Sequence, residues 1–185
     1  MIIASEKRRQ NIAEYLLYMW QIEDIIRANN LDIERIKTNV IDRFYSLTED
    51  QRREMTEWYE SLIDMMRQEG VEKKGHLQIN RNVLSSMVDL HQALLKDPDP
   101  KFEPYRAEFY RTLPYVVELR SKAGENKVGE IETCMNALYG MLMMRLQQKE
   151  ITPQTMDALK QISRFIALLS RDFKLNEEES LFKKD

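Results

Sequence analysis

Apolar residues recur at spacings of three and four along most of the chain and do not alternate with polar ones, which is typical of amphipathic helices. Residues 12–26 are the most apolar stretch: on a helical wheel of about 100° per residue, apolar side chains fill one face and spread onto both flanks. Such a helix is usually buried among other helices. The pattern predicts an all-α protein, a helical bundle of about seven helices packed around this N-terminal helix.

Capping residues and helix breakers divide the pattern into these helices. Typical helix starts are Asp32, Thr48 with Gln51, and Thr152 before Pro153. Gly70 is a typical helix end. The sharpest boundary is the DPDP segment at 97–100, because proline lacks a donor and disfavours a helical residue before it. The predicted helices span about 5–30, 32–44, 48–70, 80–96, 102–117, 127–150 and 153–173.

Two segment pairs resemble each other, 59–69 with 139–150 and 93–97 with 167–172. Helical sequences often resemble one another by chance, so this internal similarity is weak evidence. It is consistent with two related helical hairpins. The 185 residues, 43% of them hydrophobic, suit a single domain spanning 1–185. The charged tail at about 176–185 is expected to fray.

Pro114 lies within one of the predicted helices, where it removes the bond to the carbonyl of Tyr110 and should kink or break the helix. A kink opens space, so the best place for a small-molecule pocket is beside it. Aromatic residues at helical spacing belong more often to the core, which is the alternative interpretation. The candidate pocket residues are Tyr105, Phe109, Tyr110 and Tyr115, with Glu23 or His91 as polar anchors.

Two charged side chains fall on apolar helix faces. Glu23 lies between Leu16 and Met19 on the wheel, where an unpaired carboxylate would be costly. Arg27, one turn further on, is the expected partner. Arg145 also falls among apolar neighbours, so we consider it a candidate buried charge that could pair with Glu23.

The sequence provides little for catalysis or metal binding. His91 falls on an apolar face, which favours a core histidine hydrogen-bonded to a neighbour over an acid or base catalyst. Neither His76 nor His91 has a glutamate three residues earlier, as a carboxylate-bridged metal site in a bundle would require. There is no Gly-x-Ser-x-Gly or Walker motif. We therefore assign no catalytic residue, metal or cofactor and favour a protein that is not an enzyme.

Composition sets limits on partners and location. With 28 basic and 31 acidic residues the net charge is −3, which favours neither nucleic acid nor an anionic membrane. A helix-turn-helix nucleic-acid binder is disfavoured, because the early basic residues alternate with acidic ones and no glycine precedes Gly70. No uninterrupted apolar run is long enough to span a membrane. The one cysteine, Cys134, excludes an internal disulfide and fits the reducing cytoplasm.

The opening segment, residues 2–32 (IIASEKRRQNIAEYLLYMWQIEDIIRANNLD), together with the chain length, resembles an uncharacterised family of cytoplasmic helical proteins from Bacteroides and related bacteria. That family is a domain of unknown function, family 4924. The resemblance implies a helical fold and a bacterial cytoplasmic location. It implies no activity and no catalytic residues.

These observations favour a non-catalytic helical protein that acts through protein association, with a homodimer as the expected form and any other protein partner unknown. Large apolar residues are abundant and suit adaptable contact surfaces, although a core could use most of them. The alternative is a small-molecule-binding protein or enzyme with a pocket near Pro114. The residues that motivate association are Tyr18, Trp20, Trp58 and the eleven methionines.

Overall fold

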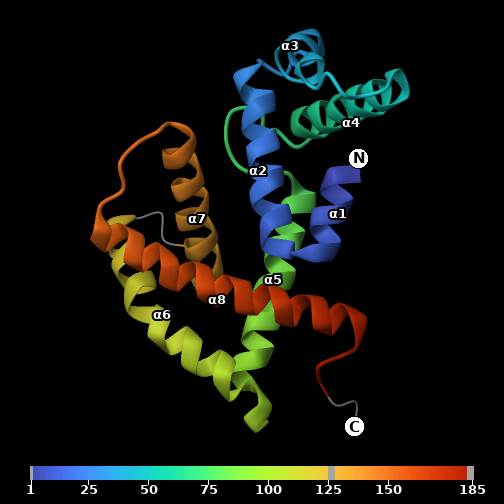
Figure 1. Cartoon of the computed structure of the whole chain (residues 1–185). Helices are drawn as coiled ribbons and strands as arrows, with labels where there is room; N and C mark the ends of the chain where they lie inside the picture. Colours follow the sequence, from blue (N-terminus) through green and yellow to red (C-terminus); the bar gives the residue numbers. More distant parts are fainter. Residues whose placement is uncertain (1, 125–127, 183–185) are drawn as a thin grey trace. The chain divides into compact units, whose positions relative to one another are not determined.

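The computed structural model describes residues 2–124 and 128–182. Every regular element in these residues is a helix, so the predicted all-α fold is confirmed, and a helical bundle fits (Figure 1). The elements are α1 (Ile2–Gln10), α2 (Ile12–Ala28), α3 (Ile33–Asn39), the 3-10 helix η1 (Ile41–Arg43), α4 (Glu49–Gln68), α5 (Gln78–Lys96), the 3-10 helix η2 (Pro100–Phe102), α6 (Glu103–Lys122), α7 (Glu130–Leu146) and α8 (Pro153–Glu178).

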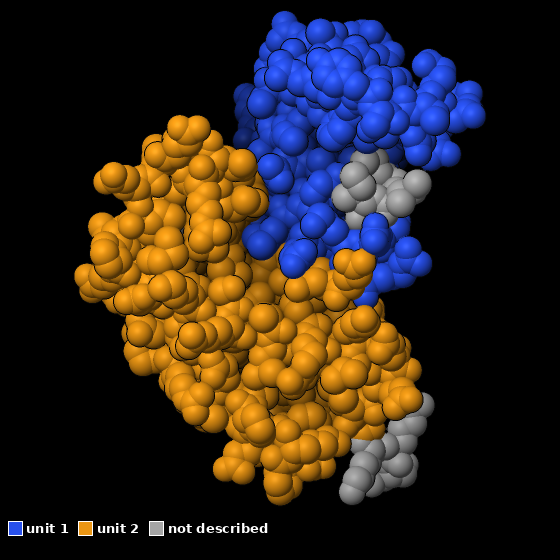
Figure 2. Space-filling model, viewed as in Figure 1, with its two compact units in different colours: residues 1–9, 14–82 blue, residues 10–13, 83–185 orange. Residues whose placement is uncertain are grey.

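The chain divides into two compact units, shown in different colours in Figure 2. Unit 1 comprises residues 1–9 and 14–82, and unit 2 comprises residues 10–13 and 83–185. The buried apolar side chains of unit 1 come chiefly from α2 and α4, and α3 packs on α4. In unit 2, α6, α7 and α8 pack on one another.

The first predicted helix is two helices, so the prediction of one continuous helix from Ser5 was wrong. The chain leaves the helical conformation at Asn11, between α1 and α2. The Asn11 side-chain oxygen accepts a hydrogen bond from the Ala13 backbone N–H at 3.0 Å, as the cap of a new helix does. A short polar side chain that binds the backbone is sufficient to end one helix and start the next.

Most other helix ends follow the predicted capping chemistry. Asp32 accepts hydrogen bonds from the backbone N–H groups of the first turn of α3, and Thr48 forms a reciprocal capping box with Gln51 at α4. The chain at the end of α2 takes a left-handed conformation at both Asn30 and Leu31, with φ of 56° at each. Leu31 N–H bonds back to the Ile26 carbonyl, which is the Schellman arrangement that satisfies the end of the helix.

Pro114 was predicted to kink or break its helix; α6 continues through Pro114 to Lys122, so the break is wrong. Pro114 lies on the exposed side of the helix, and the loss of one backbone donor there is outweighed by the packing of α6 on α7 and α8. Helix α7 begins at Glu130; its predicted start at residue 127 lies outside the described residues.

The predicted pair of related hairpins is not reproduced. Helices α7 and α8 pack on each other, whereas α4 packs on α3 and η1, and α5 passes into unit 2 after residue 82. The predicted frayed tail is helical as far as Glu178, and Lys101 then donates a hydrogen bond to the Leu181 carbonyl. The last three residues of that predicted tail, 183–185, lie outside the described residues.

Candidate functional site

Glu23 on α2 lies at the centre of a polar network inside unit 1. Its side chain is 0% exposed, and its carboxylate has three partners from one short segment further along the chain. Oε2 lies 2.6 Å from Nδ1 of His76, and Oε1 accepts hydrogen bonds from the Leu77 backbone N–H at 2.9 Å and from Nδ2 of Asn80 at 2.6 Å. A buried carboxylate on an apolar helix face requires hydrogen-bond partners, and these three contacts supply them.

The network also caps a helix. His76, Leu77 and Asn80 lie at the start of α5, where the first backbone N–H groups have no partner within the helix. Glu23 binds one of these groups, and the Glu69 carboxylate accepts another from Gln78 at 2.6 Å. Carboxylates are favourable at the positive end of a helix dipole. Glu23 therefore fastens α2 to the first turn of α5 within unit 1.

Arg27 does not pair with Glu23, so that predicted ion pair is wrong. Its guanidinium donates to Asp24 at 2.9 Å and to the backbone carbonyls of Val71 and Gly75. One helical turn of α2 thus holds the 71–77 loop, with Arg27 binding the carbonyls of Val71 and Gly75 and Glu23 binding the N–H of Leu77. Gly75 has a φ of 87°, a conformation that a residue with a side chain rarely adopts.

His76 is the exposed edge of this network, with a side chain 32% exposed. Its ring stacks on Trp20 with a centroid distance of 4.3 Å and an interplanar angle of 15°. Because Nδ1 faces Glu23, Nε2 is the ring nitrogen left for other partners. No local sequence pattern indicated this role, because His76 and Glu23 are 53 positions apart. Within residues 2–124 and 128–182, no group of three His, Cys, Asp or Glu side chains is placed to share a metal ion with it.

In unit 2, His91 lies in the core, in agreement with the core interpretation of this histidine. Its Nδ1 is hydrogen-bonded to the Tyr105 hydroxyl at 2.7 Å, and the rings of Phe109 and Phe165 meet it edge-on at 4.8 and 5.8 Å. Burial lowers the pKa of His91 to about 4, against a weaker opposite effect of the Glu130 carboxylate. His91 is therefore neutral at neutral pH.

The phenol and thiol beside this histidine are also held in their neutral forms. Burial raises the pKa of Tyr105, with smaller contributions from Asp172 and Cys134. Burial, followed by Glu130, raises the pKa of Cys134 to about 12. A thiol in this state is a poor nucleophile, so Cys134 is a packing residue.

The four aromatic candidates near Pro114 are divided between core and surface. Tyr105 and Phe109 are buried with His91, Tyr115 is half-buried, and Tyr110 is 63% exposed. Glu23, the other proposed anchor, has its own partners in unit 1. This division gives no support to a ligand pocket formed by these residues.

Arg145 is exposed, so its prediction as a buried charge is wrong. The helical wheel placed it among apolar residues, but those neighbours are not buried either. Leu142 is half-buried and Leu146 is 58% exposed. We refer to residues 139–146, the second half of α7, as the α7 end.

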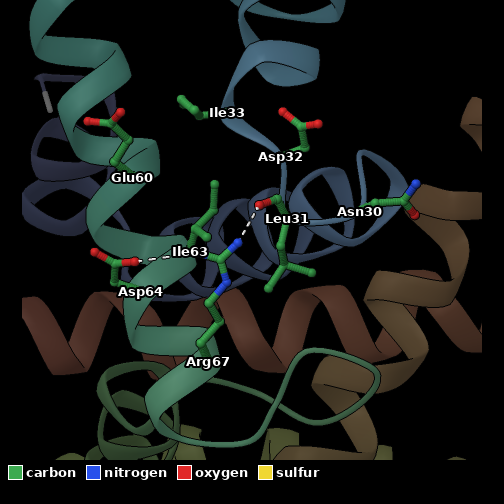
Figure 3. A pocket seen from close by; sticks show the side chains of 8 residues that line it. All are labelled: Asn30, Leu31, Asp32, Ile33, Glu60, Ile63, Asp64 and Arg67. Atoms are coloured by element: carbon green, nitrogen blue, oxygen red, sulfur yellow. Dashed lines mark hydrogen bonds and ion pairs between the residues drawn. The ribbon is translucent and has the colours of Figure 1, made fainter.

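A surface hollow of about 600 Å³ lies in unit 1 between the α2–α3 connection and α4 (Figure 3). Three of the polar side chains that line it already interact with the surrounding helices. Arg67 donates to the Leu31 carbonyl at 3.0 Å and lies 3.6 Å from Asp64, and Asp32 caps α3. The contacts of Arg67 and Asp32 therefore stabilise the turn between α2 and α3.

Comparison with known proteins gives a family and no activity. A family model described as Domain of unknown function (DUF4924) matches residues 1–180. No curated protein and no solved structure matches the chain. Among the described residues, none of the helices is both long and apolar enough to cross a membrane.

Proposed function

Because this chain belongs to the DUF4924 family, whose function is unknown, we propose from its own surface that it is a non-catalytic helical protein that associates with a second copy of itself through the α7 end. The observation that supports this proposal is a set of large apolar side chains in the α7 end that are not fully buried. A buried enzymatic centre is not needed to explain Glu23 or His91, since both have structural partners.

The two halves of α7 differ in burial, and the less buried half is the more apolar one. The first half places Ile131, Cys134, Met135 and Leu138 in the core of unit 2. In the α7 end, six of the eight residues are apolar and none is buried. A helix that is apolar all round is usually buried on every side. The six residues are Tyr139, Met141, Leu142, Met143, Met144 and Leu146.

A second copy of the chain is the occupant that this face fits best. Arg145 is the one charged residue in the α7 end, so two identical faces can meet with little like-charge repulsion. Protein interfaces are depleted in charge at their centres and enriched in methionine and aromatic residues. Flexible methionine side chains also adapt to their own symmetry copies. A two-fold contact between α7 ends is the simplest closed assembly.

We further propose the bacterial cytoplasm as the location. The chain has one cysteine, and it is a free and buried thiol. Chains in oxidising compartments more often carry paired cysteines. Fractionation of the native host with an antibody against this chain tests the location, and recovery in a membrane or secreted fraction would contradict it.

Sedimentation velocity over a wide concentration range tests the association. The wild-type chain is expected to shift from monomer to dimer, and the double variant Met143→Glu, Leu146→Glu is expected to stay monomeric. The matched control is Tyr110→Glu, Val117→Glu on α6, where the side chains are 63% and 57% exposed. This control should dimerise like the wild type. A wild-type chain that stays monomeric, or a control pair that dissociates instead, would overturn the proposal.

A further inference from the structure

The α7 end contains three of the eleven methionines of the chain, Met141, Met143 and Met144, and all three are half-buried. Four other methionines are 2% exposed or less, so reagents in solution reach the two sets differently. These four are Met19, Met66, Met87 and Met135. Met65 and Met156 are half-buried too, but they lie outside the α7 end.

Thioethers react with hydroperoxides without any further reagent. The sulfur takes one oxygen atom from the peroxide, the O–O bond breaks, and the remainder leaves as water or an alcohol. The sulfur is oxidised by two electrons and the peroxide is reduced by two. The product, methionine sulfoxide, is polar and chiral where the thioether was apolar, and it disrupts methionine-rich contacts.

We propose that Met141, Met143 and Met144 form an oxidation site at which hydroperoxides make the α7 end polar and thereby release the second copy of the chain. The release step rests on the proposed function, whereas the selective oxidation does not. Met141 and Met144 are three positions apart and share a helix face, so two sulfoxides form side by side there. Met143 and Leu146 are also three positions apart, so they too share a helix face.

The cysteine sulfur atom does not compete for the peroxide. Cys134 is buried in unit 2, and its pKa is raised to about 12, so it lacks the thiolate that would attack a hydroperoxide. The accessible sulfur atoms in the described part of the chain are therefore thioethers, and the α7 end contains the one group of three close in sequence.

Peptide mapping by mass spectrometry after brief hydrogen peroxide treatment of the full chain tests the site. Met141, Met143 and Met144 are expected to gain oxygen on the order of tenfold faster than the four buried methionines. In denaturant this difference should vanish, because every thioether is then accessible. Equal rates in the folded protein would overturn the oxidation site.

Sedimentation of the treated protein tests the release. Oxidised wild type is expected to be monomeric at concentrations where untreated protein is dimeric. The triple variant Met141→Leu, Met143→Leu, Met144→Leu keeps an apolar surface, so it should dimerise and remain dimeric in peroxide even though Met65 and Met156 are still present. Release of this variant by peroxide, or a dimer that survives full oxidation of the three sites, would overturn the inference. A monomer before treatment would instead overturn the proposed function together with the release step, while the peptide map decides the oxidation site independently.

Discussion

Glu23 in unit 1 and His91 in unit 2 are both buried titratable side chains, but their surroundings differ. Glu23 has three polar partners, all contributed by residues 76–80. His91 has one hydrogen bond, to Tyr105, and is otherwise enclosed by aromatic rings. Unit 1 thus accommodates a carboxylate by supplying donors, whereas unit 2 accommodates an imidazole by keeping it neutral.

The Glu23 carboxylate and the His91 ring each have hydrogen-bond partners, as buried polar groups require. Beside Glu23, the Oδ1 of Asn80 is buried without a partner, although its Nδ2 donates to that carboxylate. The apolar residues of the α7 end are the reverse case, because they are large side chains without full cover. This is why the proposed function lies on that surface and not at either buried centre.

The largest expected effect is on the Glu23 network. Glu23→Ala removes the acceptor of three donors and leaves Asn80 and the Leu77 N–H buried without it. We expect the free energy of unfolding to fall by about 3–5 kcal/mol, as when a buried pair is broken. Urea titration measures it. The matched control is Glu14→Ala on the same helix, an exposed residue 3.5 Å from Lys7, for which about 0.5 kcal/mol is expected. A loss below about 1 kcal/mol for Glu23→Ala would contradict the stabilising role of the network.

The next effect is the pH dependence that His91 causes. Its pKa is about 4 when folded and near the reference value of 6.5 when unfolded. Between these values the unfolded chain binds a proton that the folded chain does not, so the stability present above pH 6.5 is lost as the pH falls towards 4. The free energy of unfolding should decrease by about 3 kcal/mol over this window from His91 alone.

Urea titrations at several pH values, on wild type and on His91→Gln, isolate this contribution. The variant lacks the titrating ring but keeps a polar side chain for Tyr105, so its stability should fall less steeply below pH 6.5. Identical slopes for the two proteins would show that His91 is not held neutral in the core.

A smaller effect is expected at Asn80, which contributes one hydrogen bond to Glu23. Asn80→Ala should cost about 1–2 kcal/mol. In a double-mutant cycle with Glu23→Ala, the two losses should not add, and the coupling should be about 1 kcal/mol. Additive losses would mean that the contact does not stabilise the network.

The smallest effect concerns the loop that Arg27 and Glu23 hold. Gly75→Ala should cost about 1 kcal/mol through backbone strain at positive φ, because the added Cβ would meet Val71 only at an ordinary 3.6 Å. Gly140→Ala is the matched control in a helix, where a Cβ meets nothing within 4 Å of its own chain, and at concentrations where the chain is monomeric it should stabilise by about 0.5–1 kcal/mol. Thermal unfolding measures both, and a shift of the same sign for the two variants would contradict the strain at Gly75.

Local chemistry made much of the fold predictable. Caps such as Thr48 with Gln51 act within one helical turn. The helical wheel placed Glu23 and His91 on apolar faces, and both side chains are buried. The partners of Glu23 could not be predicted from the sequence. Periodicity gives the direction of a side chain but not the segment that it contacts 53 or more residues away. Arg145 failed for another reason. In a helix apolar on all sides, periodicity cannot distinguish a buried half from an exposed one.

Native mass spectrometry of the protein as purified, beside a denatured sample, tests the central claim most directly. We predict the mass of two chains under native conditions, with nothing added, and the mass of one chain after denaturation. A single chain at all concentrations would contradict self-association through the α7 end. A single chain carrying an additional mass that is lost on denaturation would contradict it too, and would favour a ligand-binding protein.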